Sequence, residues 1–339
     1  MADPLVDVRN LGVRLVTGQR ETSLVDDVSF TVARGEVLCI VGESGCGKTI
    51  TARSIMGLNR NDRRFSLSGQ ILFQGRDLMA LSDAEMRGIR GTGIGMIFQD
   101  PMTSLNPLHR IGRQIGEGMR LHMKLSEAEI RERTLSLLAQ VGIPNPRTRI
   151  DDYPHQFSGG MRQRAMIALA LACSPALLIA DEPTTALDVT TQKQILTLIA
   201  RLKDTYGMGL ILITHDLGIV AEIADRIMVM YAGQCVEVGP VRSVFRSPRH
   251  PYTAGLLASM PAANRGRTER LPSIRGTPPL LAEGRPQGCA FQPRCDFAFD
   301  RCAAMPPLSA DDASEGHLDR CWLPSGRLAQ RDAAGEMRR

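Results

Sequence analysis

The sequence predicts an α/β fold built around a parallel sheet. Three short, continuously apolar runs support this prediction: residues 37–41, 177–180 and 210–213. Strands that are buried on both faces of a parallel sheet have this composition, whereas half-exposed strands alternate apolar and polar residues. Between the last two runs, residues 190–206 have the apolar spacing of a helix, which Gly207 is expected to end. We therefore expect a strand, a crossover helix and a second parallel strand.

Helices are expected to interrupt the sheet in the middle of the chain. Residues 104–150 contain no strand-like run. Ser126 and Glu129 form a capping-box pattern, and apolar residues follow them at helical spacing. Residues 161–172 form a second helical stretch that stops before a proline. Together these features predict a helical subdomain over about residues 100–165.

Composition and charge narrow the class of protein. The 339 residues are 43% apolar, which is enough for a buried core. The net charge is +5 without a dense basic block, which is poor support for a nucleic-acid partner. The apolar stretch at residues 165–173 is too short to span a bilayer. The first residues lack the basic region and apolar core of a signal peptide, so a cytosolic location is expected.

The composition changes in the last third of the chain. From residue 272 onwards prolines become frequent and helical periodicity disappears. We predict a main domain of residues 1–245 and a small extension of residues 246–339, in which a cysteine motif covers residues 289–321. Only one glycine-rich loop of the kind described next occurs, which excludes two main domains in tandem.

A glycine-rich loop lies between the first apolar run and a predicted helix. Its residues are Gly42, Glu43, Ser44, Gly45, Cys46, Gly47, Lys48, Thr49 and Ile50. In a phosphate-binding loop the glycines let backbone N–H groups point at phosphate oxygens, helped by the positive end of the following helix. Lys48 is expected to bridge the β- and γ-phosphates of ATP, and the Thr49 hydroxyl to bind Mg²⁺. A chance glycine turn is the alternative, which the strand before and the helix after disfavour.

An acidic pair follows the second apolar run. Asp181 stands where a buried strand reaches the edge of the sheet, and a carboxylate there can hold Mg²⁺ directly or through water. Glu182 is expected on the other side of the strand, where it can orient or deprotonate an attacking water. A solvated strand end is the alternative reading of this pair. His215 follows the third apolar run in the same way, although a lone histidine is more often structural.

The order of these motifs resembles that of ABC (ATP-binding cassette) ATPases. Between the phosphate loop and the acidic pair, residues 158–164 read Ser-Gly-Gly-Met-Arg-Gln-Arg, which is similar to the signature of that family. The resemblance implies a phosphate-loop nucleotide-binding domain with a mixed sheet core, an antiparallel β subdomain and a helical subdomain, followed here by a small irregular Cys-rich extension. It also implies that Ser158, Gly159 and Gly160 contact ATP held by a second subunit. Ser158 is equally suited to cap the helix that follows it, and both roles are compatible.

Several positions take a role from this resemblance. Glu182 is implied as the general base of an ATPase, and His215 as the switch histidine at the γ-phosphate. Gln99 is implied to join Mg²⁺ and the attacking water, so that the Mg²⁺ ligands are Thr49, Gln99 and Asp181. Asp188 is implied to act across the dimer. Residues 102–107 are where transporters of this family receive a coupling helix from the membrane subunit.

Finer similarity points to one branch of the family. Residues 153–164, 249–253 and 289–295 resemble the ATPase subunits of bacterial dipeptide, oligopeptide and nickel importers, in particular the member whose signature contains methionine. The resemblance implies a second, non-identical ATPase subunit, two integral-membrane permease subunits and an external solute-binding protein. It places the chain on the cytoplasmic face of the bacterial inner membrane, with peptide as the commonest cargo. The alternatives are the cassette of a soluble complex for carbon–phosphorus bond cleavage or DNA repair, and a nucleotide-gated iron–sulfur sensor with little turnover.

Two positions depart from the pattern of the family. ABC ATPases usually stack the adenine on an aromatic residue before the phosphate loop, yet residues 11–28 contain none. Arg20 or an aliphatic side chain is expected to take that place. Met161 removes an amide side chain from the signature, which bears on contacts to the ribose of the partner's nucleotide.

Four cysteines lie close together near the end of the chain: Cys289, Cys295, Cys302 and Cys321. A reducing cytosol leaves thiolates available as metal ligands. Three of them directly follow an arginine, Arg294, Arg301 or Arg320, and this charge is expected to favour the thiolate. The lack of a close Cys-x-x-Cys pair argues against a zinc ribbon, while four thiolates suit an iron–sulfur cluster. The family resemblance implies a [4Fe–4S] cluster, with zinc and unligated thiols as alternatives.

Overall fold

The computed structural model describes residues 3–100, 104–185, 187–260, 273–310, 316–324 and 328. They divide into two compact units, each made of several chain segments. The first unit comprises Met1–Val6, Val32–Val37 and Leu72–Ile213. The second unit comprises Asp7–Thr31, Leu38–Ile71 and Thr214–Arg339. Each unit contains part of the predicted nucleotide-binding machinery.

The first unit contains a parallel sheet in the strand order β8-β7-β6. Its strands are β6 (Ile94–Ile97), β7 (Leu177–Asp181) and β8 (Gly209–Ile213), and every residue in them is buried. Helix α8 (Val189–Tyr206) connects β7 to β8 and ends at Gly207, whose φ of 61° is left-handed. The predicted strand-helix-strand crossover is therefore confirmed. The strands appear in the sequence as continuous apolar runs because both of their faces are buried.

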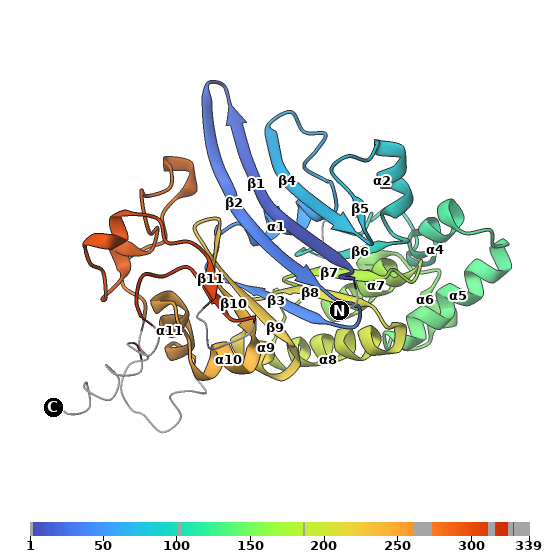
Figure 1. The fold of residues 1–339 in the computed structure, drawn as a ribbon. Helices are drawn as coiled ribbons and strands as arrows, with labels where there is room; N and C mark the ends of the chain where they lie inside the picture. The colour runs from blue at the N-terminus through green and yellow to red at the C-terminus, as the bar shows by residue number, and fades with distance from the viewer. Residues whose placement is uncertain are drawn as a thin grey trace. The chain divides into compact units, whose positions relative to one another are not determined.

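The helical part of the first unit follows β6 along the chain (Figure 1). It contains α4 (Ile111–His122), α5 (Glu127–Gln140), α6 (Pro146–Arg149), a 3₁₀ turn (Pro154–Gln156) and α7 (Gly159–Leu171). Ser126 and Glu129 form the predicted capping box at the start of α5. Earlier in this unit lie the short strand β5 (Arg76–Asp77), which pairs antiparallel with the end of β4, and helix α2 (Asp83–Ile89).

The second unit contains a sheet in the order β2-β1-β4. These strands are β1 (Val6–Thr17), β2 (Arg20–Val32) and β4 (Phe65–Phe73), which lie side by side in Figure 1. Buried and exposed residues mix along β1 and β2, so only one face of each strand meets the core. This is the β subdomain that the family resemblance implies.

A second, mixed sheet of this unit has the order β11-β12-β10-β9-β3. Its strands are β3 (Val37–Val41), β9 (Arg226–Tyr231), β10 (Gln234–Pro240), β11 (Ser309–Ala310) and β12 (Leu318–Asp319). Strand β3 pairs parallel with β9, and β9 pairs antiparallel with β10. The helices of the unit are α1 (Lys48–Ile55), α9 (Leu217–Ile223), α10 (Val241–Arg246) and α11 (Pro251–Ala258).

The described part of the C-terminal extension adds little regular structure. It contains helix α11, the 3₁₀ turns Leu281–Glu283, Gln292–Arg294 and Asp300–Ala303, and the two-residue strands β11 and β12. Strand β12 extends the sheet by pairing with β10, with Glu237 opposite Asp319. Glu237 is fully buried and accepts hydrogen bonds from the backbone N–H groups of Arg249 (2.8 Å) and His250 (2.9 Å). The domain boundary that the sequence predicts near residue 245 stays a prediction.

Candidate functional site

The glycine-rich loop connects β3 to α1 in the second unit, as the sequence predicts. Gly42, Gly45 and Gly47 have φ values of 150°, 79° and 102°, a region of backbone space that favours glycine. Gly42 is also required by space, because a Cβ atom there would lie 2.2 Å from the carbonyl oxygen of Met230 in β9. Gly47 is the N-cap of α1, so the loop delivers the start of a helix to the place where phosphate is expected.

Lys48 is held against the inside of the loop. Its side chain is 6% exposed, and Nζ donates hydrogen bonds to the carbonyl oxygens of Gly42 (2.8 Å) and Glu43 (3.1 Å). Cys46 is also buried, and burial raises the pKa of its thiol. Ser44 and Gly45, at the tip of the loop, are exposed. The arrangement fits a lysine fixed for contact with phosphate groups that enter from solvent.

Glu43 is held in place by two residues from the end of the chain. Its carboxylate accepts hydrogen bonds from Arg294 Nη1 (2.6 Å) and Nη2 (3.0 Å). Its backbone N–H donates to the hydroxyl oxygen of Tyr252 at 2.9 Å. Neither Arg294 nor Tyr252 is expected from the sequence to contact the loop. The one signal in the sequence is that both residues lie in segments that resemble the importer family, residues 249–253 and 289–295.

His215 belongs to the same unit as the phosphate loop. The preceding residue, Thr214, donates its backbone N–H to Ile40 O in β3 at 3.3 Å, which ties this segment to the strand that enters the loop. His215 itself is exposed. The next residue, Asp216, caps α9 by accepting from the backbone N–H groups of Gly218 (2.9 Å) and Ile219 (3.2 Å). The histidine is thus held between a strand contact and a helix cap.

The acidic pair lies in the first unit, at the end of β7. Asp181 is 2% exposed, whereas Glu182 has left the strand and has a φ of 45°. A non-glycine residue in the left-handed region is uncommon and is often found at functional positions. Glu182 Oε2 accepts hydrogen bonds from Gln99 Nε2 (3.0 Å) and from Thr185 Oγ1 (3.2 Å). The structure therefore brings together Gln99 and Glu182, which the sequence separates by 83 positions.

The signature also lies in the first unit. Ser158 and Gly159 are exposed, and Ser158 Oγ caps α7 by accepting from the Met161 N–H at 3.3 Å. Asp188 caps α8 by accepting from the N–H (2.9 Å) and hydroxyl (2.7 Å) of Thr191. The Thr191 hydrogen bonds lower the pKa of the Asp188 carboxyl, which favours its charged form. Gly160 faces the same threonine, since a Cβ on it would lie 3.6 Å from Thr191 Cγ2.

The four C-terminal cysteines lie close enough for their charges to interact. Burial raises the pKa of Cys289, of Cys295 to about 11 and of Cys321 to about 12. The charges of Cys289 and Cys302 raise the pKa of Cys295 further, and those of Cys289 and Cys295 act on Cys321 in the same direction. Among the residues that the structure describes, no three His, Cys, Asp or Glu side chains are grouped so that they could hold a metal ion.

The expectation that neighbouring arginines favour thiolates is wrong for Cys295 and Cys321, whose pKa values rise instead. The main physical reason is burial, and the arginines are engaged with other partners. Arg294 pairs with Glu43 and Arg320 with Asp27, while Arg301 lies over the Trp322 ring at 3.8 Å.

Comparison with known proteins agrees with this arrangement. A family model described as "ABC transporter" matches residues 25–185, and one described as "Oligopeptide/dipeptide transporter, C-terminal region" matches residues 236–302. The "Probable peptide ABC transporter ATP-binding protein y4tR" of Sinorhizobium fredii is 52% identical over 322 residues, which cover 95% of each chain. The chain belongs to the ATP-binding subunits of ABC transporters. As a member of this family it hydrolyses ATP.

Other relatives and solved structures extend the same result. The "Dipeptide transport ATP-binding protein DppD" of Bacillus subtilis is 48% identical over 334 residues, 98% of this chain and 99% of the relative. The dimeric post-hydrolysis structure of the ATP-binding cassette MJ0796, bound to ADP and Pi, covers 70% of this chain and 99% of its own, with 27% identity and a TM-score of 0.63. The structure of cbiO1 from Clostridium perfringens covers 72% and 92%, with 30% identity and a TM-score of 0.62.

Family membership sets the coarse context of this subunit. ABC transporter ATPases dimerise and work with membrane permease subunits. No helix in the described part of the chain has both the length and the apolar character that a membrane crossing requires. Of residues 102–107, where a coupling helix is expected, residues 102 and 103 lie outside the described residues.

Proposed function

We propose that this ATPase subunit powers the uptake of dipeptides or oligopeptides. The observation that carries the cargo class is the match of residues 236–302 to the C-terminal region of oligopeptide and dipeptide transporters. Relatives that are about half identical over nearly the whole chain bear the names of peptide transport or peptide import proteins. In the structure, part of this region contacts the phosphate loop through Tyr252 and Arg294.

The proposed catalytic roles follow from the contacts of Lys48 in the phosphate loop and from the contact of Glu182 with Gln99. The loop N–H groups and Lys48 bind the phosphates of ATP, and His215 contacts the γ-phosphate. Glu182 accepts a proton from the water whose oxygen bonds to the γ-phosphorus, while the bond between that phosphorus and the β,γ-bridging oxygen breaks and ADP leaves. The hydrogen bond from Gln99 holds the Glu182 carboxylate in one orientation.

Magnesium is the metal proposed for the nucleotide. The proposed ligands are the Thr49 hydroxyl, the Gln99 amide and the Asp181 carboxylate. All three supply oxygen donors, which Mg²⁺ prefers, and Asp181 is nearly fully buried at the end of β7. When bound, the ion neutralises charge on the β- and γ-phosphates.

The signature and Asp188 are proposed to face the nucleotide of the other ATPase subunit. Ser158 and Gly159 are exposed at the N-terminus of α7, a 13-residue helix, so their side of the helix is accessible to a partner. Helix N-termini favour anionic ligands because their N–H groups and dipole are directed outwards. The hydrogen bond from the Thr191 N–H to the Asp188 carboxylate fixes the N-terminus of α8.

The proposed assembly contains this chain, a second and non-identical ATPase subunit, and two membrane permeases, supplied by an external solute-binding protein. Its place is the cytoplasmic face of the bacterial inner membrane, held there by the permeases. The names of relatives as peptide import or dipeptide transport ATP-binding proteins support a place in a transporter. No nucleic-acid partner is proposed, since the net charge is only +5 over 339 residues.

The test is a purification of the tagged chain in mild detergent followed by reconstitution into vesicles. We expect two membrane subunits and a second ATPase to co-purify, and ATP hydrolysis to rise when binding protein and a dipeptide are added. Nickel is the matched control solute. Co-purification with soluble proteins alone would overturn the transport proposal and favour the cassette of a soluble complex.

An iron–sulfur cluster on Cys289, Cys295, Cys302 and Cys321 is proposed as a structural element of the extension. The chemistry of the donors suits such a cluster, since four thiols are its usual iron ligands, but the described side chains are not grouped for metal binding in this structure. The raised pKa values of Cys289, Cys295 and Cys321 imply that bound metal must displace protons, which makes occupancy pH-dependent. The anaerobically purified chain should contain iron and absorb broadly near about 400 nm. Cys321→Ser should remove the colour, while Cys173→Ser should not; a colourless wild type that contains zinc or no metal would refute the cluster.

A further inference from the structure

Arg294 is buried and uses its whole guanidinium group. It is 7% exposed and forms a two-point contact with the Glu43 carboxylate, at 2.6 and 3.0 Å. Nε donates to the carbonyl oxygen of Arg275 at 2.7 Å, and Nη2 donates to that of Gly276 at 3.3 Å. Forked pairs of this kind fix both orientation and distance, unlike a point charge. The contact with Glu43 raises the pKa of Arg294 further above its ordinary value.

Tyr252 holds the same loop residue through its main chain. Its hydroxyl oxygen accepts the N–H of Glu43 at 2.9 Å, and its ring is fully buried. The ring packs against Tyr231 (4.7 Å between centroids) and Phe291 (5.4 Å). Arg294 lies beside the same aromatic cluster, 5.7 Å from the centroid of Tyr231. The cluster is therefore a rigid support for both contacts to Glu43.

Glu43, which is held by Arg294 and Tyr252, in turn contacts the phosphate-binding lysine. The carbonyl oxygen of Glu43 is one of the two acceptors that hold Lys48 Nζ, at 3.1 Å. A continuous series of contacts thus runs from Arg294 and Tyr252 through Glu43 to Lys48. Without Arg294 the Glu43 carboxylate would remain as an unpaired negative charge in the loop that must receive polyphosphate.

We propose that Arg294 is a positioning residue for ATP binding, which pairs the Glu43 carboxylate and so keeps the phosphate loop receptive to nucleotide. The C-terminal extension thereby takes part in the nucleotide site, although Arg294 and Glu43 are 251 positions apart in the sequence. This inference rests on the proposed phosphate site at Lys48. Tyr252 assists by fixing the main chain of the same residue.

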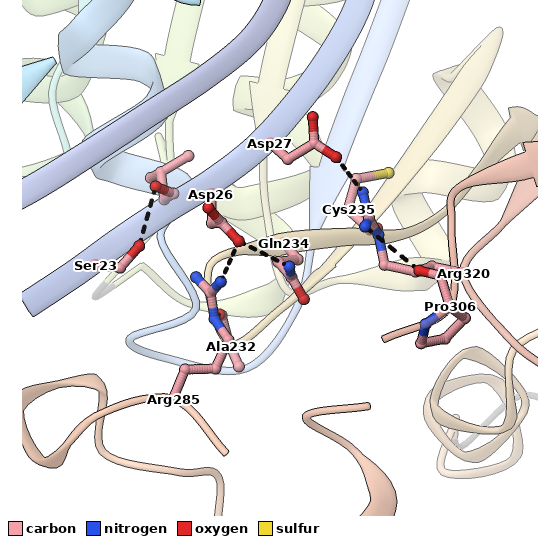
Figure 2. A network of polar contacts seen from close by, with 10 residues as sticks. Ser23, Asp26, Asp27, Ala232, Gln234, Cys235, Arg285, Pro306 and Arg320 are labelled. Carbon is pink, nitrogen blue, oxygen red and sulfur yellow. Dashed lines mark hydrogen bonds and ion pairs between the residues drawn. The ribbon is translucent and has the colours of Figure 1, made fainter. Parts of the chain in front are cut away.

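The other arginines of the extension provide a matched control (Figure 2). Arg320 is 6% exposed and directly precedes a cysteine, like Arg294, but it binds Asp27 of β2 at 3.0 Å. It also donates to the carbonyl oxygens of Cys235 (3.1 Å) and Pro306 (3.5 Å), away from the loop residues. Arg285 contacts Asp26 and the carbonyl oxygen of Ala232. Arg320→Met should therefore loosen the extension as much as Arg294→Met without leaving Glu43 unpaired.

The experiment measures the dissociation constant of Mg-ATP for the full-length chain by calorimetry in five forms: wild type, Arg294→Met, Arg320→Met, Glu43→Gln and the double variant Glu43→Gln/Arg294→Met. We expect Arg294→Met to weaken binding about ten-fold, within the range typical of coupled sites. Arg320→Met should change it less than about two-fold. In the Glu43→Gln background, Arg294→Met should cost less than about three-fold, because the charge that it leaves unpaired is gone.

Two results would overturn the inference. One is an equal loss of Mg-ATP affinity in Arg294→Met and Arg320→Met. The loss would then come from loosening of the extension and not from the unpaired Glu43 carboxylate. The other is an equal cost of Arg294→Met in the wild-type and Glu43→Gln backgrounds, since the effect must act through that carboxylate. If Arg294→Met does not fold, as judged by circular dichroism, Arg294→Lys replaces it in the same cycle. Lysine keeps the charge and loses the fork, so an intermediate loss is expected, and none would count against the inference.

A further variant separates this inference from the assignment of the site. Lys48→Ala must abolish measurable ATP binding if the loop is the phosphate site. Retained binding in Lys48→Ala would remove the site assignment itself. Lost binding in Lys48→Ala together with an unchanged constant in Arg294→Met would leave the site in place and remove only the role of Arg294.

Discussion

Gln99 Nε2 lies 3.0 Å from Glu182 Oε2, and the Thr185 hydroxyl lies 3.2 Å from the same oxygen. One carboxylate oxygen is thus oriented by two donors from different loops. A carboxylate held in this way loses little orientational freedom when it accepts a proton from water. The left-handed backbone at Glu182, with a φ of 45°, adds to this fixed orientation.

Replacing Glu182 by Gln should abolish turnover and preserve ATP binding. The amide has nearly the same shape but cannot accept the proton, and general-base catalysis typically contributes about 10²- to 10⁴-fold. ATP hydrolysis and nucleotide-dependent association should be measured with the partner ATPase present. We expect a stable ATP-bound dimer. Turnover equal to that of wild type would show that another group is the base.

Gly42→Ala should destroy the phosphate loop. The new Cβ would lie 2.2 Å from Met230 O and 2.8 Å from Cys46 Sγ, so β9 or the loop has to move. Overpacking of this kind costs about 1–3 kcal/mol or more, and we expect ATP binding to be lost with it. Gly75→Ala is the control, because its φ of 77° is also left-handed but no atom lies within 4 Å. It should lower the free energy of unfolding by about 1–2 kcal/mol and leave ATP binding intact.

Asp188 offers a way to separate a cap from a catalytic contact. Asp188→Asn keeps an N-cap acceptor for Thr191, whereas Asp188→Ala removes it and should cost about 1 kcal/mol of stability. If Asp188 acts across the dimer through its charge, both variants should lower ATPase activity in the assembled pair. Full activity in Asp188→Asn, with a loss confined to Asp188→Ala, would mean that the residue only caps α8.

The stability of the protein should depend on pH through His250. Burial lowers the pKa of this histidine to about 4, against an ordinary value of 6.5. Its Nδ1 accepts the N–H of Tyr252 at 3.1 Å, so the folded state needs the neutral ring. The contribution is therefore complete above about pH 6.5 and is lost as the pH falls towards 4, because the unfolded state binds the proton first.

The size of this effect is about 3 kcal/mol between the two pKa values. Chemical unfolding at several pH values should be compared for wild type and His250→Asn, which keeps an N-cap acceptor for α11. The wild type should lose stability relative to the variant between pH 6.5 and 4. Parallel pH curves for the two proteins would show that His250 is not buried in its neutral form.

Much of the fold follows from local sequence patterns. The buried strands β3, β7 and β8 are visible as short apolar runs because both of their faces are covered. Helices α5, α7 and α8 carry capping residues at their N-termini, and those contacts join residues only three positions apart. Strands β1 and β2 could not be located in this way, because their mixed burial gives no clean alternation.

In the candidate site, too, contiguous motifs are predictable from the sequence and contacts between distant residues are not. The residues of the phosphate loop, the acidic pair and the signature form contiguous motifs, so the sequence identifies them. The support of Glu43 by Arg294 and the orientation of Glu182 by Gln99 join residues 251 and 83 positions apart. Neither spacing carries a local signal. The expectation that a preceding arginine favours the thiolate is wrong for Cys295 and Cys321, because burial raises their pKa values and Arg294 and Arg320 pair with carboxylates.

The antiparallel pairing of β10 with β12 has a consequence for the synthesis of the protein. Strand β12 and Arg320 are among the last described residues, yet they complete a sheet and bind Asp27, 293 positions earlier. Translation delivers residues at about 5–20 per second, so the N-terminal strands wait tens of seconds for these partners. The edge of β10 and the buried carboxylate of Glu237 lack this cover for a shorter time, because β10 ends at Pro240 and β12 begins at Leu318. Until then the free edge of β10 is open to pairing with another chain.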